Sequence, residues 1–173
     1  MVVIGSTGML GKAIVQYSKE NGLKVFGISR NNADINVDIL NYVELYSAIK
    51  QIKPRVIVNC AAIINVNYCE KNPKEAYLVN SHLVAMLVDI CRKLDIFLVQ
   101  ISTDHFFTKD IMKKHNEIDA VKFVNNYAIT KYAGEQFAIS YPYSLSIRTN
   151  IVGFRHRGRI TFLEWVLSSL EKN

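Results

Sequence analysis

Tyr127 and Lys131 are the two residues in this chain whose types and spacing best support chemistry. They lie four positions apart within residues 125–140, where apolar side chains recur at helical spacing. Residues four apart share one face of a helix, so the phenol and the ammonium are predicted to be neighbours. A nearby positive charge lowers the pKa of a phenol and makes it a better acid near neutral pH. The pair predicts proton donation to a carbonyl oxygen; the alternative is a half-buried tyrosine beside a solvated lysine.

A glycine-rich turn at the start of the chain predicts a dinucleotide-binding site. It follows apolar residues 2–4, which are typical of a buried parallel strand, and opens a helical pattern at residues 9–20. Glycines permit a tight turn and close approach of the backbone to a pyrophosphate, which the free N–H groups of the helix N-terminus can bind. The alternative is a turn of small residues without a ligand. The cofactor-binding residues expected here are Gly5, Thr7, Gly8, Met9, Leu10 and Gly11.

Arg30 bears on the choice of cofactor. It ends the second predicted strand, residues 24–29. An acidic residue at this place would bind the ribose hydroxyls of NAD, whereas an arginine accommodates the 2′-phosphate of NADP. NADP(H) is therefore preferred over NAD(H), which stays possible; the alternative is a solvated surface arginine.

Strands and helices alternate along the rest of the chain, which predicts an α/β fold of the Rossmann type with a doubly wound parallel sheet. Helical patterns cover residues 41–53, 73–94, 125–140 and 162–170. Strand patterns cover residues 2–4, 24–29, 56–59, 97–102 and 145–148. Asn72 is expected to cap the second of these helices, with Pro73 in its first position. The whole chain, residues 1–173, is expected to form one NAD(P)-binding domain.

Composition narrows the classes of protein that fit. Half of the residues are hydrophobic, but the longest apolar run, residues 83–88, is too short to span a membrane, and no signal peptide is visible. Three cysteines without a C-x-x-C pair predict reduced thiols in a cytoplasmic protein. The net charge of +6 comes from dispersed lysines, which argues against nucleic acid, and the histidines lack metal-ligand spacing. The basic residues 155–159 are expected in a solvated loop, or alternatively at a substrate diphosphate.

Seven segments, spread nearly end to end, carry a family resemblance. They are G-S-T-G-M-L-G (5–11), A-D-I-N-V-D-I (33–39), K-P-R-V-I-V-N-C-A-A (53–62), V-N-Y-C-E (66–70), I-S-T-D-H-F-F (101–107), N-N-Y-A-I-T-K-Y-A-G-E (125–135) and I-R-T-N (147–150). In this order they resemble the extended short-chain dehydrogenase/reductases, and more narrowly the dTDP-4-dehydrorhamnose reductase group. The resemblance implies an NADP(H)-dependent reductase of a nucleotide-activated 4-keto sugar, acting in nucleotide-sugar biosynthesis.

The resemblance also implies roles for individual residues. Thr103, with Ser102 as the less favoured choice, would hydrogen-bond the substrate carbonyl beside Tyr127 and Lys131; a turn cap is the alternative. Further cofactor contacts are implied for Asp38, Ile39, Cys60, Ala61, Ala62 and Asn80, with ordinary packing as the alternative for several. The substrate pocket would be edged by Ile64, Val66, Asp104 and His105.

Departures from the group bear on the substrate. His105 stands where the group usually has tyrosine, Ile151 where the reductases have tryptophan, and Asn67 where they have aspartate. The chain also stops in the helix after the fifth predicted strand. We therefore expect truncation before the sixth strand and the substrate domain, and little turnover from these residues alone.

Two other functions stay open. An NADP-binding regulatory subunit without turnover would fit a chain that lacks half of the substrate pocket. A nucleotide-sugar epimerase or dehydratase would use the same scaffold, although dehydratases usually add an acidic pair where this chain has Asp104 followed by His105. A homodimer is a possible assembly.

Overall fold

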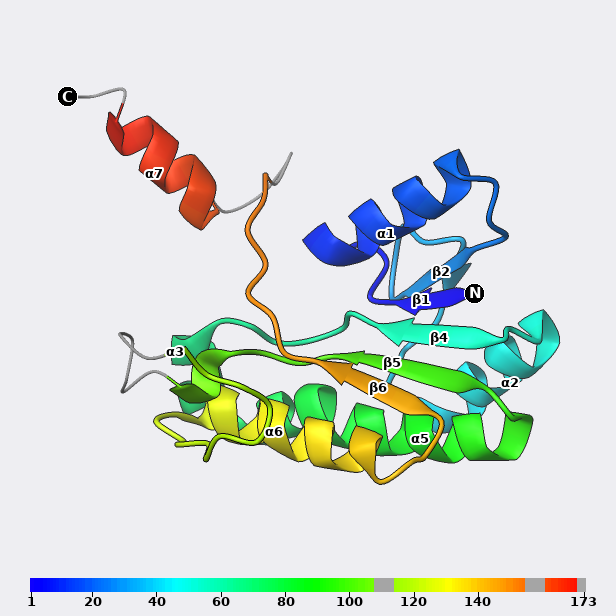
Figure 1. Ribbon diagram of the computed structural model, residues 1–173. Coiled ribbons are helices and arrows are strands. Elements are labelled where there is room, and N and C mark those ends of the chain that lie inside the picture. Colours follow the sequence, from blue (N-terminus) through cyan, green and yellow to red (C-terminus); the bar gives the residue numbers. More distant parts are fainter. Residues whose placement is uncertain (108–113, 155–160, 171–173) are drawn as a thin grey trace.

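The computed structural model describes residues 1–107, 114–154 and 161–170, and its centre is a parallel sheet with helices on both faces (Figure 1). The six strands are ordered β3-β2-β1-β4-β5-β6, and every neighbouring pair is parallel. Their bounds are β1 Val2–Ile4, β2 Phe26–Ser29, β3 Ile35–Asn36, β4 Val56–Asn59, β5 Phe97–Ile101 and β6 Ser144–Ile147. The predicted Rossmann-type α/β fold is thereby confirmed. The basic residues 155–159 lie outside the described residues.

Four of the helices lie within one residue of their predicted bounds. They are α1 Met9–Glu20, α2 Tyr42–Ile52, α6 Asn126–Ile139 and α7 Phe162–Leu170. The sequence pattern did not predict β3, which is only two residues long, or the short helix α3 at Val66–Lys71. The helix predicted over residues 73–94 consists of α4 Pro73–Tyr77, the π-helical segment η1 Leu78–His82 and α5 Leu83–Leu94.

The hydrophobic core occupies both faces of the sheet. Helices α2 and α5 contribute the larger cluster, which includes Leu45, Ile49 and Leu87 packed against Ile4 and Ile57 of the central strands. Helix α1 covers a smaller cluster around Val3 and Val58 on the other face, and Figure 1 shows α1 opposite α5 and α6. Strands buried on both faces have few polar positions to spare, so polar side chains collect where the strands end.

Helix α6 is tied to η1 by hydrogen bonds and by a close backbone approach. The Ser81 hydroxyl donates to the Thr130 carbonyl oxygen at 2.7 Å, and Asn80 Nδ2 donates to Thr130 Oγ1 at 3.1 Å. A Cβ on Gly134 would lie 2.1 Å from the Asn80 carbonyl oxygen, so only glycine fits there. Single π-helical turns within longer helices are frequent at functional sites. This one fixes the helix that carries Tyr127.

Two smaller features complete the fold. Asn72 is the N-cap residue of α4 and Pro73 its first residue, as predicted, but the Asn72 side chain donates to the Tyr68 carbonyl oxygen and makes no capping bond.

Within residues 1–107, 114–154 and 161–170, no helix combines the length and apolarity that crossing a membrane requires.

Gly134→Ala tests the close contact between α6 and η1. The added methyl group must push the two helices apart, because the atom that it meets belongs to the backbone. We expect a loss of about 1–3 kcal/mol in the free energy of unfolding, as for other overpacked sites. Urea unfolding followed by circular dichroism measures it. Gln136→Ala, at an exposed position of the same helix, should change this free energy by less than about 0.5 kcal/mol.

Candidate active site

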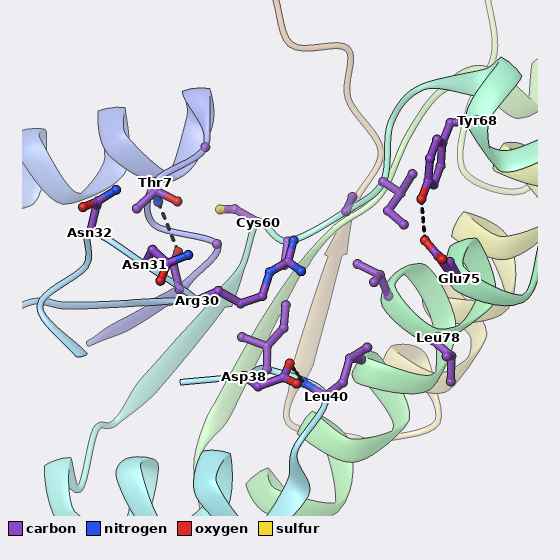
Figure 2. A pocket seen from close by; sticks show the side chains of 18 residues that line it. Thr7, Arg30, Asn31, Asn32, Asp38, Leu40, Cys60, Tyr68, Glu75 and Leu78 are labelled. Carbon is purple, nitrogen blue, oxygen red and sulfur yellow. Dashed lines mark hydrogen bonds between the residues drawn. The ribbon is translucent and has the colours of Figure 1, made fainter. Parts of the chain in front are cut away.

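A cavity of about 840 Å³ lies at the carboxyl ends of the strands. In the order β3-β2-β1-β4-β5-β6 the direction of winding changes between β1 and β4, which is where open α/β sheets bind their ligands. Figure 2 shows the lining side chains converging from the β1–α1 turn, the end of β2, the end of β4 and the helices beyond it. The predicted cofactor residues in this lining are Gly5, Thr7, Gly8, Arg30, Asp38, Ile39, Cys60, Ala61 and Ala62.

The glycine turn forms one wall, and its geometry requires glycine at two positions. Gly5 has a φ of +74°, and a Cβ there would lie 2.8 Å from the Ala61 backbone nitrogen. A Cβ on Gly11 would lie 2.3 Å from the Gly5 carbonyl oxygen, so Gly11 permits close packing of α1 on the turn. Gly8 is the N-cap residue of α1 and brings no side chain to the first N–H groups, which are then available to an anion. The turn therefore fits a pyrophosphate.

Three of the residues expected at this turn do not line the cavity. Met9, Leu10 and Gly11 lie in the first turn of α1, and Gly11 serves packing as described above. Their contact with a cofactor stays a prediction.

The adjoining part of the lining is polar and comes from the end of β2, where the Ser29 hydroxyl accepts a hydrogen bond from the Thr7 N–H of the glycine turn at 3.3 Å. Arg30 reaches from this strand end into the cavity in Figure 2, and Asn31 and Asn32, which follow it in the chain, also belong to the lining. Asn32 has a φ of 56°, a conformation that asparagine tolerates better than most residues. One cation and two amides at this place would suit a phosphate group. Sequence reasoning singled out the arginine alone, although the R-N-N run was a usable signal.

The far rim of the cavity was missed entirely by sequence reasoning. Tyr68 of α3 donates a hydrogen bond from its hydroxyl to the Glu75 carboxylate of α4, as Figure 2 shows. The contact joins two short helices, so no local sequence pattern predicts it. The other lining residues without a predicted role are Ser29, Asn31, Asn32, Leu40, Ile63, Leu78 and Val79.

Thr103 and Tyr127 come together beyond the end of β5. The Thr103 side chain lies close enough to the Tyr127 phenol to lower its pKa, and the backbone N–H of His105 donates to Thr103 Oγ1 at 3.2 Å. Ser102 is engaged elsewhere, since its hydroxyl donates to Glu135 at 2.6 Å. The geometry therefore favours Thr103 over Ser102 as the partner of Tyr127. Two hydroxyls placed side by side in this way can both reach one carbonyl oxygen.

Lys131 is the most deeply buried cation near this pair. Only 3% of its surface is exposed, and its ammonium donates to the Ile101 carbonyl oxygen at 2.7 Å. Burial lowers the pKa of Lys131 to about 8, against the opposing influence of Cys60 and of the Glu135 carboxylate. The lysine is thus a group that can exchange its proton close to neutral pH.

The structure contradicts the expectation that Lys131 lowers the pKa of the Tyr127 phenol. Burial raises the pKa of the Tyr127 phenol, and the hydrogen bond from Thr103 acts in the opposite direction. The Lys131 ammonium points to the Ile101 carbonyl oxygen, so it does not lower the pKa of the phenol in this structure. Helical spacing placed the two residues on one face but said nothing of where the ammonium would find its hydrogen bond.

A buried ion pair holds the end of β5 against α6. Glu135, one turn beyond Lys131, accepts from Ser102 and from Arg148, whose Nη2 lies 2.7 Å from Glu135 Oε1. The guanidinium of Arg148 lies over the rings of Phe106 and Phe107, 5.4 and 5.6 Å from their centroids. The pair therefore ties the segment around Thr103 to both α6 and the end of β6.

A second buried network runs from the cavity wall to Lys131. The Ala61 backbone N–H donates to Asn59 Oδ1, and Asn59 Nδ2 donates to Gln100 Oε1 at 2.8 Å. Gln100 Nε2 donates in turn to the Ile101 carbonyl oxygen at 2.9 Å, the same oxygen that accepts from Lys131. Both lone pairs of this carbonyl are therefore occupied. A carbonyl held in this way fixes the lysine relative to the cavity wall.

Asn80 lies behind the cavity wall. It is 1% exposed, its Oδ1 accepts from the Ile63 N–H at 2.8 Å and its Nδ2 donates to the Ile63 carbonyl oxygen at 3.0 Å. Ile63 itself lines the cavity. The side chain thus shapes the segment after β4, and a direct contact of Asn80 with a cofactor stays a prediction.

The residues expected at a substrate have different surroundings. The His105 ring lies edge-on to the Tyr127 ring, with centroids 5.6 Å apart, whereas Ile64 is 62% exposed and Val66 begins α3. Asp104 is exposed and follows Thr103 directly. Among the described residues, no group of three or more His, Cys, Asp and Glu side chains could hold a metal ion.

Comparison with known proteins identifies the family. A family model described as the RmlD substrate binding domain matches residues 1–172, and the chain belongs to this family. The dTDP-4-keto-6-deoxy-D-glucose reductase of Streptomyces niveus is 32% identical over 135 residues, which cover 78% of this chain and 46% of the relative.

Two solved structures are similar to this one. A dTDP-4-dehydrorhamnose reductase from Clostridium acetobutylicum has a TM-score of 0.85 and 26% identity, and the match covers 99% of this chain and 59% of that one. A dTDP-4-dehydrorhamnose reductase from Bacillus anthracis in complex with NADP has a TM-score of 0.77 and 26% identity, over 85% of this chain and 51% of that one. The chain thus spans about half the length of the proteins that it matches.

Lys131→Met tests the cost of the buried ammonium. A lysine whose pKa falls from 10.5 to about 8 on folding destabilises the protein most below pH 8, and the penalty shrinks as the pH rises from 8 towards 10.5. Such a shift corresponds to about 3 kcal/mol. We expect Lys131→Met to raise the free energy of unfolding at pH 7 and to lose more than half of this advantage at pH 9.5. Urea unfolding at the two pH values measures it; an advantage that does not depend on pH would contradict the lowered pKa.

Proposed function

We propose that this chain is the NAD(P)-binding domain of a reductase that uses NADPH to reduce a nucleotide-activated 4-keto sugar. The observation that carries the proposal is the placement of two neighbouring hydroxyls, those of Thr103 and Tyr127, beyond the end of β5, with the buried Lys131 one helical turn further along α6. The relative from Streptomyces niveus and the two solved structures carry names of reductases of this kind.

The residues of the cavity fit a dinucleotide phosphate. Gly5 and Gly8 let the backbone approach a pyrophosphate, and the N-terminus of α1 favours its negative charge. Arg30, Asn31 and Asn32 would surround the 2′-phosphate, which is why we favour NADP(H) and regard NAD(H) as the weaker ligand. When bound, the nicotinamide supplies a hydride to the carbonyl carbon of the substrate.

The side chains of this chain would bind the carbonyl oxygen of the substrate and supply its proton. The hydroxyls of Thr103 and Tyr127 bind the carbonyl oxygen and stabilise the negative charge that develops as the carbon is reduced. Tyr127 then gives its proton to this oxygen, so the product is an alcohol and the phenolate recovers a proton from solvent. Lys131 would supply a hydrogen-bond donor for the ribose of the cofactor.

Partner and compartment are part of the proposal. All three cysteines, Cys60, Cys69 and Cys91, are free thiols, which suits the reducing cytoplasm. A homodimer is the assembly that we propose; among the described residues β6 forms one edge of the sheet, and Leu145 and Ile147 are exposed on it.

Arg30→Ala tests the choice of cofactor. A charge-assisted hydrogen bond contributes about 1.5–3 kcal/mol, so the affinity for NADPH should fall about ten- to a hundredfold while that for NADH stays nearly constant. Calorimetric titration of this chain with each cofactor measures both affinities. Arg55→Ala, which removes an exposed arginine outside the cavity lining, is the matched control. Equal losses for NADPH and NADH would refute the contact with the 2′-phosphate.

Tyr127→Phe tests the acid. The variant keeps the ring and removes only the hydroxyl, so hydride transfer should slow by about 10²–10⁴-fold while the affinity for NADPH changes little. Single-turnover oxidation of NADPH by the whole reductase, with its substrate domain, measures the rate on a panel of 4-keto nucleotide sugars. Tyr132→Phe, five residues further along α6 in an aromatic cluster with Phe106 and Phe123, is the control. A wild-type rate in Tyr127→Phe would exclude the proposed mechanism.

A further inference from the structure

His105 occupies an unusual place beside the proposed acid. It begins the short 3₁₀ segment His105–Phe107, two residues after Thr103, and it is partly exposed. Its backbone N–H donates to Thr103 Oγ1, and its ring meets the Tyr127 ring edge-on. A substrate carbonyl held by the hydroxyls of Thr103 and Tyr127 would therefore bring its neighbouring atoms close to the imidazole.

The tautomer of this imidazole follows from the cap of α6. Asn125 is the N-cap residue, and its Oδ1 accepts from the Ala128 N–H at 2.8 Å. The amide nitrogen Nδ2 must then be the atom that lies 3.0 Å from His105 Nε2, and an amide nitrogen can only donate. Nε2 therefore offers its lone pair, and in a neutral ring the hydrogen sits on Nδ1. The same asparagine caps the helix and sets the tautomer.

The Nδ1–H donor of the His105 ring has no hydrogen-bond partner among the described residues. Among the described residues, the hydrogen bonds of His105 run from its backbone N–H to Thr103 and between Nε2 and Asn125, which leaves Nδ1 unused. A half-buried N–H beside two hydroxyls would be satisfied by an oxygen of the ligand that they bind. On a sugar, the oxygens nearest to the ketone are the hydroxyls on the adjacent carbons.

We propose that His105 is a substrate-binding donor, and that Asn125 is the positioning residue that keeps its hydrogen on Nδ1. The imidazole then binds a hydroxyl oxygen next to the ketone, while Thr103 and Tyr127 bind the ketone oxygen. This inference rests on the proposed function for the identity of the substrate, but the tautomer can be measured without any turnover. The alternative is that the bond between His105 and Asn125 only orders the loop after β5.

The variant Asn125→Asp distinguishes a substrate-binding role of His105 from a bond that only orders the loop after β5. Aspartate caps helices as well as asparagine does, and its second oxygen can still bond to His105, so the order of the loop is kept. That oxygen accepts a hydrogen bond where the amide donated one, so the neutral ring must carry its hydrogen on Nε2 and lose the donor on Nδ1. His105→Phe removes the donor outright and keeps a ring against Tyr127. Asn41→Asp makes the same change at the N-cap of α2, away from the cavity.

The first measurement is the tautomer itself. Two-bond ¹H–¹⁵N correlation spectra of this chain with labelled histidine distinguish the tautomers and the charged ring, and His105→Phe assigns the signal. We expect the Nδ1–H form in the wild type and in Asn41→Asp. In Asn125→Asp we expect the Nε2–H form, at a pH where the spectrum shows a neutral ring. An Nε2–H form or a mixture in the wild type would overturn the proposal.

The second measurement is the contact with substrate. Adding a 4-keto nucleotide sugar together with NADP⁺ should shift the Nδ1 resonance of His105 in the wild type and leave it unmoved in Asn125→Asp. In turnover by the whole reductase, with its substrate domain, Asn125→Asp and His105→Phe should each lower kcat/KM for the sugar about three- to tenfold, the loss of one neutral hydrogen bond, with NADPH affinity unchanged.

The outcomes keep the two proposals apart. The role of His105 would be overturned if the sugar did not shift the Nδ1 resonance of the wild-type protein, or if both variants kept the kcat/KM of the wild type. Neither result would count against the proposed reductase function. A shifted resonance without any oxidation of NADPH by the whole reductase, with its substrate domain, would support the role of His105 as a donor and count against the reductase.

Discussion

The hydrogen bond from the Lys131 ammonium to the Ile101 carbonyl oxygen fixes the geometry on which the site depends. A buried ammonium is stable only when strong partners surround it, so α6 must lie where the lysine can reach the end of β5. Thr103 follows Ile101 by two residues, and Tyr127 precedes Lys131 by one helical turn. A single contact between a helix and a strand end therefore places both hydroxyls. The Glu135 carboxylate and the amide of Gln100 hold the two sides of this contact in register.

The polar groups buried at the carboxyl ends of the strands make this part of the sheet less stable than apolar packing would. The opposite end and the middle of the strands are apolar, whereas the carboxyl ends of β4 and β5 bury an amide pair, an ion pair and a lysine. Hydrophobic replacements of such groups often stabilise proteins, so retention of these groups needs another reason. The reason that fits is that a proton donor requires a fixed and dry position, which polar partners with specific directions provide and apolar packing does not.

Local sequence signals predicted the parts of the site that are local. Gly11 is a glycine because it packs on Gly5 six residues earlier, and Tyr127 and Lys131 are four residues apart on one helix, so both features were readable from spacing. The direction of the Lys131 side chain was not readable, because its acceptor is thirty residues away in the sequence. The strand β3 was too short to show a pattern, and the contact of Tyr68 with Glu75 depends on how two helices pack.

The arrangement separates the chemistry from the choice of substrate. The cavity, Thr103, Tyr127 and Lys131 depend on the sheet and on α6, which are tied together by buried bonds. His105 and Ile64, by contrast, lie in segments after strand ends, where a change of side chain leaves the core contacts intact. One scaffold can therefore keep its proton donor while the residues around the ketone change. His105 is one of these residues, and its bond to Asn125, the N-cap of α6, fixes its side chain through a residue that the helix already requires.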